Sequence, residues 1–206
     1  MVIWLEPRSA RVDDTLRGGS HPNRPFLDRL LSDPADDSAW QALKDDYDHQ
    51  APAWAEWANE QGDYDLALLV ALERVGPREV VIEVGAGSDD SSLRIQAAGR
   101  VTLVSDVSFE MISRNPGRRR LCCDVRRLPL ADASVDLICG LNAVPHLPEF
   151  ARVLRPGGAV AWAHSFGPET PMYVSPERLE AQAPPGWTVA AQRVDAGEWC
   201  LLEVPA

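Results

Sequence analysis

The stretch Val80-Val-Ile-Glu-Val-Gly-Ala-Gly-Ser-Asp-Asp-Ser-Ser-Leu93 decides the fold class of this chain of 206 residues. Its continuous apolar first half is typical of a strand that is covered on both faces, as strands of parallel sheets are. Gly85 and Gly87 follow, and glycine permits the positive φ of a tight strand-to-helix turn. The N–H groups that begin the next helix favour an anionic group. The stretch therefore predicts either an ordinary tight turn or a cradle for a nucleotide-like ligand.

Short apolar strands and helices alternate after this stretch. Strands are expected at 79–84, 101–105, 120–123, 135–139, 159–164, 187–194 and 199–204, and helices at 66–75, 91–98, 109–114, 147–154 and 176–183. This alternation predicts a doubly wound, mostly parallel seven-stranded α/β sheet with helices on both faces. Asp195-Ala-Gly197 is a hairpin signal between the last two strands, so the sheet is expected to end in a C-terminal antiparallel hairpin.

Residues 1–45 differ from the rest, because prolines and glycines interrupt them repeatedly. A short helix is expected at 26–31, where apolar residues recur at helical spacing. A helical pattern then runs from 45 to 74 with a break at Gly62. We therefore predict a partly ordered N-terminal arm over 1–45 and one α/β domain over 46–206.

Composition limits the classes of ligand and the location. The net charge of −11 opposes nonspecific binding to nucleic acid or to anionic membranes. No apolar run approaches the roughly 20 residues of a membrane helix, and no signal peptide is expected. A cytoplasmic protein is therefore predicted. The four cysteines form no C-x-x-C pair, and no metal site is predicted.

Asp106 is a second indication of a nucleotide-like ligand. It follows an expected strand, about 20 residues past Gly85, where a carboxylate reaches ribose hydroxyls in nucleotide-binding units. An acid here also suits the cap of the next short helix. Two cofactors compete for the turn. A nicotinamide dinucleotide requires glycine where Asp90 stands, and Asp89 and Asp90 would repel its pyrophosphate. S-adenosylmethionine carries no phosphate and is better tolerated.

Four segments, in order and at sensible spacing, resemble the motifs of one family. They are Val-Ile-Glu-Val-Gly-Ala-Gly at 81–87, Leu-Val-Ser-Asp at 103–106, the stretch 123–138, and Phe-Ala-Arg-Val-Leu-Arg-Pro-Gly-Gly at 150–158. Together they resemble the class I, seven-stranded, Rossmann-like family of S-adenosylmethionine-dependent methyltransferases. The stretch 47–54 is similar to the helix that often lies over the cofactor in that family. With the final hairpin, the resemblance covers the predicted α/β domain.

The resemblance implies S-adenosylmethionine as cofactor and assigns roles to residues. The methionyl end would be held by the turn, the ribose by the end of the second strand, the adenine by the stretch after the third strand, and the methyl or amino group by the loop after the fourth. The cofactor-binding residues expected on this basis are Tyr47, Glu83, Gly85, Ala86, Gly87, Asp106, Val107, Asp124, Val125 and Asn142.

Two departures from the family pattern bear on activity. Asp89 stands where the family usually has a third glycine, so its carboxylate either crowds the cofactor or serves as a helix cap that points away. The loop 140–149 is shorter than usual and would wall the substrate pocket less completely. Both departures keep open a non-catalytic domain that binds a cofactor or a partner.

Methyl transfer requires mainly alignment, and a base only where the acceptor must lose a proton. His146 and His164 are the candidate catalytic bases, because they follow the expected fourth and fifth strands and titrate near neutrality. A structural hydrogen bond is the alternative role for each. Trp54 and Trp57 either floor an apolar acceptor site or pack the lid helix onto the sheet. The predicted function is a methyltransferase that acts on an O, N or C nucleophile of a small molecule. The oligomeric state stays open.

Overall fold

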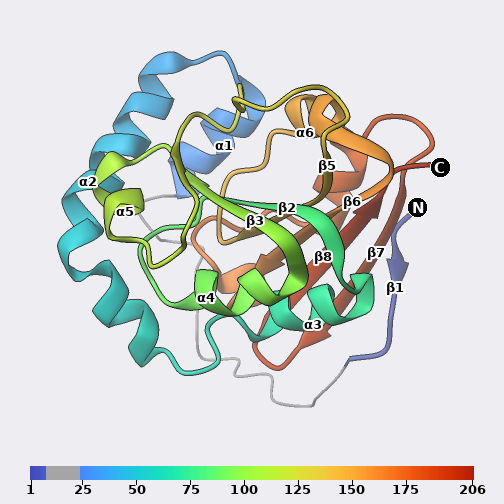
Figure 1. The fold of residues 1–206 in the computed structure, drawn as a ribbon, viewed down its shortest axis with the longest axis horizontal. Coiled ribbons are helices and arrows are strands. Elements are labelled where there is room, and N and C mark those ends of the chain that lie inside the picture. The colour runs from blue at the N-terminus through green and yellow to red at the C-terminus, as the bar shows by residue number, and fades with distance from the viewer. Residues whose placement is uncertain (8–23) are drawn as a thin grey trace.

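The computed structural model describes residues 1–7 and 24–206 and shows one eight-stranded sheet (Figure 1). The strand order is β1-β7-β8-β6-β5-β2-β3-β4. The predicted doubly wound α/β architecture is confirmed, but the predicted count of seven strands is wrong by one. The additional strand is β1 (Ile3–Trp4), which pairs in parallel with β7 at the edge of the sheet.

The parallel centre of the sheet follows the predicted alternation. It consists of β2 (Arg78–Val84), β3 (Gly99–Asp106), β4 (Arg120–Cys122), β5 (Val135–Leu141) and β6 (Leu154–His164). β2 lies between β3 and β5, with Ile82 opposite Leu103 and Ile138. The predicted C-terminal hairpin is confirmed: β7 (Thr188–Val194) and β8 (Gly197–Glu203) are antiparallel, and β8 is antiparallel to β6.

Helices cover both faces of the sheet. The helices are α1 (Arg24–Ser32), α2 (Asp37–Glu60), α3 (Leu66–Val75), α4 (Ser91–Ile95), α5 (Phe109–Arg114), α6 (Leu147–Val153) and α7 (Pro176–Gln182), with short 3₁₀ turns at Gln96–Ala98 and Gly167–Glu169. Side chains alternate along a strand, so Ile82 joins a buried cluster with residues of α1, α6 and α7, whereas Val81 joins a second cluster with α3. Figure 1 shows α3 and α4 on one side of the sheet and α1 and α6 on the other.

The described part of the predicted arm packs against the sheet. Leu27 and Leu30 of α1 are fully buried, and they share a core cluster with Ile82. α2 begins where the Asp36 side chain accepts a hydrogen bond from the backbone N–H of Ala39, 3.1 Å away. α2 is continuous through position 45, the predicted boundary between arm and domain. The division of the chain at that position remains a prediction. Residues 8–23 of the arm lie outside the described residues.

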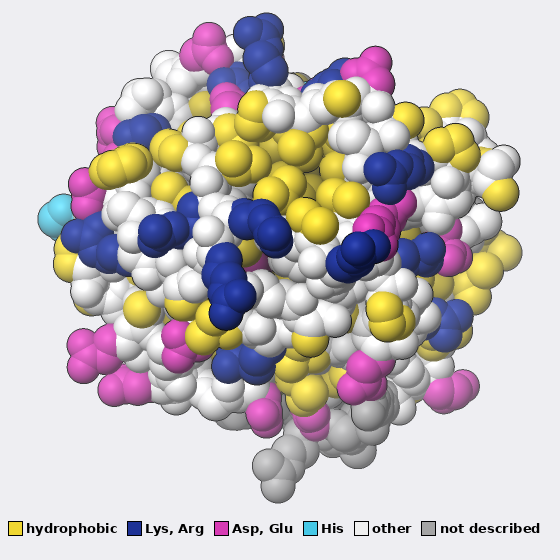
Figure 2. Space-filling model, viewed as in Figure 1, with side chains coloured by type: hydrophobic (Ala, Val, Ile, Leu, Met, Phe, Trp, Pro, Cys, Tyr) yellow, Lys and Arg dark blue, Asp and Glu magenta, His cyan; other side chains and the backbone are white. Residues whose placement is uncertain are grey.

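The surface charge is unevenly distributed. Figure 2 shows apolar side chains grouped on one face, with Lys and Arg side chains around them, although the chain carries a net charge of −11. Residues 118–120, a run of three arginines that ends at the first residue of β4, are all exposed to solvent. Across the described residues, every helix is too short or too polar to cross a membrane.

Candidate cofactor and acceptor site

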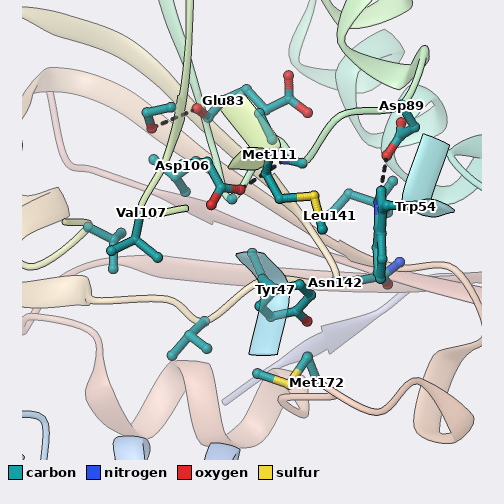
Figure 3. A pocket seen from close by; sticks show the side chains of 18 of the residues that line it. Tyr47, Trp54, Glu83, Asp89, Asp106, Val107, Met111, Leu141, Asn142 and Met172 are labelled. Carbon is teal, nitrogen blue, oxygen red and sulfur yellow. Dashed lines mark hydrogen bonds between the residues drawn. The ribbon is translucent and has the colours of Figure 1, made fainter. Parts of the chain in front are cut away.

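A cavity lies at the carboxyl ends of β2, β3 and β5, and side chains of α2 form one of its walls (Figure 3). In a doubly wound sheet this is the edge where ligands bind. Nine of the ten residues predicted to contact a cofactor line the cavity: Tyr47, Glu83, Gly85, Ala86, Gly87, Asp106, Val107, Val125 and Asn142. The sequence motifs therefore converge on one place, although they are far apart along the chain.

The turn after β2 depends on glycine for two reasons. Gly85 and Gly87 have positive φ values of 65° and 55°, a region that L side chains rarely adopt. A Cβ atom at Gly85 would lie 2.5 Å from the Cβ atom of Ala143, and one at Gly87 would lie 3.2 Å from Nε1 of Trp54. The turn thus packs closely against the loop after β5 and against α2.

Asp106 ends β3 and connects two strand ends. Its Oδ2 accepts from the backbone N–H of Gly87 at 3.0 Å, and its Oδ1 accepts from that of Ser108 at 2.8 Å. Burial raises the pKa of Asp106 to about 6, even though both N–H groups favour the ionised form. A carboxylate has about four lone-pair sites, so two acceptor positions remain for a ligand.

Glu83 lies on β2 and is almost fully buried. Its Oε2 accepts from the Ser92 hydroxyl at 2.6 Å, which ties the strand to α4. Burial raises the pKa of Glu83 to about 8 against this hydrogen bond. The Asn115 amide supports the same turn, because it donates to the carbonyl of Gly87 at 3.0 Å and to the Ser92 hydroxyl at 3.0 Å. Glu83 therefore helps to fix the turn from within the protein.

Asp89 joins the turn to α2. Its Oδ1 accepts from the Ser91 backbone N–H at 2.9 Å and also from the Ser91 hydroxyl. Its Oδ2 accepts from the Trp54 indole N–H at 3.3 Å, the contact drawn in Figure 3. The side chain lines the cavity, yet both of its oxygens bind protein donors. Asp89 thus stabilises the start of α4 and also holds the indole of the lid helix beside the turn.

Asn142 adopts a left-handed conformation, with φ of 53°, directly after β5. Its Oδ1 accepts from the Ser165 backbone N–H at 2.9 Å, and its Nδ2 donates to the Ser165 hydroxyl at 2.7 Å. Burial, followed by the nearby Asp89 carboxylate, raises the pKa of Tyr64 above its usual value. The contacts with Ser165 fix Asn142 at the base of the cavity.

Asp124 is the predicted contact that does not line the cavity. Its carboxylate binds the Arg126 guanidinium, at 2.9 Å to Nε and 2.6 Å to Nη2. Burial opposes ionisation of Asp124, but the hydrogen bonds and charge of Arg126 outweigh it and lower the pKa. Arg126 also reaches Asp37 at 2.8 Å and stacks over the Trp40 ring. The cavity wall at this position is formed by the neighbours Cys123 and Val125 instead.

The two candidate bases also lie outside the cavity lining. His146 is half-buried before α6, and burial lowers its pKa despite the nearby Asp124 and Glu149 carboxylates. His164 is buried at the end of β6, with its Nε2 3.2 Å from both backbone polar atoms of Val174. Their catalytic role remains a prediction from the sequence, and this geometry gives His164 a structural hydrogen bond.

A second cavity adjoins the first. The two share the side chains of Tyr47, Trp54, Tyr64, Asn142 and Met172. The second cavity is completed by Gln50, Ala53, Trp57, Phe166, Thr170 and Pro171. It lies between α2 and the segment that follows β6, so Trp54 and Trp57 do face an apolar pocket. Figure 3 shows Tyr47, Trp54, Asn142 and Met172 around the space beneath Asp106.

Comparison with known proteins identifies the segment that carries this turn. Residues 82–162 match the family model of the methyltransferase domain. This segment resembles a methyltransferase domain. The resemblance to class I S-adenosylmethionine-dependent methyltransferases is therefore confirmed, and the matched residues include the turn, the end of β3 and the loop after β5.

Curated relatives match part of the chain. Demethylmenaquinone methyltransferase of Mycobacterium sp. (strain JLS) is 39% identical over 95 residues, which are 41% of this chain and 40% of that protein. Malonyl-[acyl-carrier protein] O-methyltransferase of Pectobacterium atrosepticum is 34% identical over 122 residues, which are 53% of this chain and 46% of that protein. The chain thus spans less than half the length of these relatives.

A solved structure agrees with the fold of this chain. The Burkholderia thailandensis 1,6-didemethyltoxoflavin-N1-methyltransferase, solved with 1,6-didemethyltoxoflavin and S-adenosylhomocysteine, superimposes with a TM-score of 0.63 at 18% identity. The match covers 84% of this chain and 91% of that chain. At this identity, the likeness establishes the fold alone.

The lining of the first cavity fits a methyl donor better than a dinucleotide. Its ionisable acids are Glu83, Asp89 and Asp106, and none of the described lining residues is a lysine, arginine or histidine. Carboxylates without a neighbouring cation repel a pyrophosphate, whereas they tolerate a ligand with a sulfonium and an ammonium group. The spare acceptor positions of Asp106 suit a ribose. The donor and acceptor set of this cavity therefore fits S-adenosylmethionine.

Proposed function

We propose that this chain binds S-adenosylmethionine and transfers its methyl group to a nucleophilic atom of a small molecule. The observation that carries the proposal is the convergence of nine expected cofactor contacts on one cavity at the carboxyl edge of the sheet. An adjoining cavity shares its wall with the first, so donor and acceptor would meet across Tyr47, Trp54 and Asn142.

Each part of the first cavity suits one part of the cofactor. The spare lone pairs of Asp106 accept hydrogen bonds from two ribose hydroxyls. The turn from Gly85 to Gly87 would lie against the methionyl end, with the backbone N–H groups of Ala86 and Gly87 already donating to Ser105 and Asp106. Val107 and Val125 provide apolar walls for the adenine. These assignments are our proposal for the cavity that the sequence motifs form.

The bound cofactor supplies a methyl group that is already activated, and the protein supplies alignment and exclusion of water. Among the described residues that line the two cavities, carboxylates and tyrosines are the only side chains that gain or lose a proton, apart from the Cys123 thiol. Burial keeps the pKa of Tyr64 and that of Cys123 above their usual values. We assign no base among these lining residues, because Glu83 and Asp89 accept hydrogen bonds from protein donors and Asp106 is assigned to the ribose. His146 and His164, outside the lining, remain the candidate bases from the sequence.

The small size of the acceptor is supported by the relatives. Their names indicate methyl transfer to demethylmenaquinone and to a malonyl group on acyl-carrier protein. The second cavity, with a volume of about 560 Å³, is within the range of small-molecule sites. A cytoplasmic location and the lack of a nucleic-acid ligand remain predictions from the sequence.

The test is release of S-adenosylhomocysteine from S-adenosylmethionine by the purified protein, screened against a panel of small nucleophiles. At least one acceptor should raise product formation above the level without acceptor, and Asp106→Ala should abolish the increase. If the protein binds the cofactor but yields no product with any acceptor, the non-catalytic alternative that Asp89 keeps open is the better account.

A further inference from the structure

An uninterrupted series of aromatic side chains surrounds the second cavity. Tyr47 and Trp54 have ring centroids 5.6 Å apart, Trp54 and Trp57 5.3 Å, Trp57 and Tyr64 5.8 Å, and Tyr64 and Phe166 6.2 Å. All five rings line the cavity. Three of the four contacts are edge-to-face, the arrangement that aromatic pairs favour. α2 supplies three of these rings from residues on one side of the helix.

The charge of the lining excludes ionised acceptors. Among the described residues that line the second cavity, none is an aspartate, glutamate, lysine, arginine or histidine. An anionic acceptor would lose its hydration, and no cationic side chain of the lining would compensate for that loss. It would also lie near the Asp89 carboxylate, which binds the Trp54 indole. A cationic acceptor would gain cation–π contact with the rings, but it would find no carboxylate in this cavity and would have to approach the sulfonium of the methyl donor.

We infer that the second cavity binds the acceptor and that this acceptor is a neutral, planar aromatic molecule. The inference rests on the proposed function, because it names the substrate class of the same site. An aromatic acceptor gains binding free energy from ring–ring contacts with the surrounding side chains, in addition to the burial of its apolar area. A saturated ring gains only from the burial. Gln50, Asn142 and Thr170 are among the polar side chains of the lining, together with the hydroxyls of Tyr47 and Tyr64, and they would orient a hydroxyl, amino or keto substituent.

Four matched probes test this inference by calorimetric titration at pH 7.5 in the presence of S-adenosylhomocysteine. They are 2-naphthol, which is neutral and planar, 2-naphthoate, which is anionic, 2-naphthylmethylammonium, which is cationic, and 2-decalol, which is neutral and saturated. We expect 2-naphthol to bind at least tenfold more tightly than each of the other three. Equal or tighter binding of any of them would overturn the inference.

Trp57→Ala locates the site, since Trp57 lines the second cavity and is absent from the lining of the first. The variant should weaken binding of 2-naphthol at least fivefold and leave the affinity for S-adenosylhomocysteine unchanged. Trp4→Ala is the matched control, because Trp4 and Trp57 are both 44% exposed and Trp4 lies on β1 at the edge of the sheet. Unchanged binding of 2-naphthol to Trp57→Ala would place the probe elsewhere and overturn the inference.

The titration with S-adenosylhomocysteine alone separates this inference from the proposed function. If S-adenosylhomocysteine binds and the selectivity for 2-naphthol is missing, the aromatic acceptor is refuted while the methyl-donor site stands. If 2-naphthol binds selectively and S-adenosylhomocysteine does not bind, the proposed function fails, and the cavity remains a site for neutral aromatic molecules.

Discussion

The affinity for S-adenosylhomocysteine should rise with pH because of Asp106. In the free protein, burial raises the pKa of this carboxyl from 3.8 to about 6, so the neutral form increases as the pH falls through that value. Ribose hydroxyls donate hydrogen bonds, and a carboxylate accepts them more strongly than the neutral acid does. Tight binding therefore requires ionised Asp106.

The size of the effect follows from proton linkage. With a pKa of about 6, roughly one Asp106 in eleven is ionised at pH 5, and nearly all are ionised at pH 7.5. If the ligand binds only the ionised form, the dissociation constant falls about tenfold between these values, or about 1.4 kcal/mol. The stability of the free protein changes in the opposite sense. A raised folded-state pKa contributes stability below about 3.8 that is lost as the pH rises through 6.

Calorimetric titrations with S-adenosylhomocysteine at half-unit steps from pH 5 to pH 9 would measure this dependence. The midpoint should lie near 6, and Asp106→Asn should bind more weakly and show no rise in this range. Glu83 also lines the cavity, but burial raises its pKa to about 8, so the midpoint of the profile distinguishes the two carboxyl groups. A flat profile, or the same rise in Asp106→Asn, would refute the assignment of Asp106 to the ribose. A midpoint near 8 would transfer the effect to Glu83.

Three further predictions concern the turn and its supports. In urea titrations, Gly85→Ala should reduce the free energy of unfolding by about 1–3 kcal/mol more than Gly62→Ala does. Both glycines have positive φ, but only a Cβ at position 85 would meet a neighbour within 4 Å, so equal losses would show that the close approach is unimportant. Asp89→Ala and Trp54→Phe should each weaken the binding of S-adenosylhomocysteine, because the two side chains share a hydrogen bond. A double-mutant cycle should give a coupling free energy of about 0.5–1.5 kcal/mol between them, and additive effects would argue against that hydrogen bond. Burial raises the pKa of Glu83 from 4.5 to about 8, so the parent protein should lose stability relative to Glu83→Gln as the pH rises from 5 to 8. Denaturant titrations measure this, and a constant difference in the free energy of unfolding between the two proteins would contradict the shift.

Local patterns in the sequence predict most of the fold. The helix expected at 109–114 and the one expected at 66–75 have those bounds in the structure, where Ser108 caps the start of the first and Gly76 follows the end of the second. β1 was missed because two residues carry no periodicity and its partner β7 lies near the other end of the chain. α2 begins at Asp37, within the stretch 33–38 whose sequence indicates a turn and a helix start, and it continues without a break through position 45.

The candidate site was predictable where backbone position decides the contact. Residues at strand ends and in the turn, such as Gly85 and Asp106, must face the cavity once the sheet forms. Asp124 was not predictable in this way, because its side chain turns to Arg126, a choice between partners that spacing does not reveal. The bond between Asp89 and Trp54 joins residues 35 positions apart, and neither residue alone indicates it.

Calorimetric titration of the purified protein with S-adenosylmethionine, S-adenosylhomocysteine and NAD tests the central claim most directly. Micromolar binding of the first two, without binding of NAD, is the predicted result, because the cavity offers ribose acceptors and apolar walls but no cation for a pyrophosphate. Binding of NAD, or no binding of either methyl-donor ligand, would contradict the assignment of this cavity to S-adenosylmethionine.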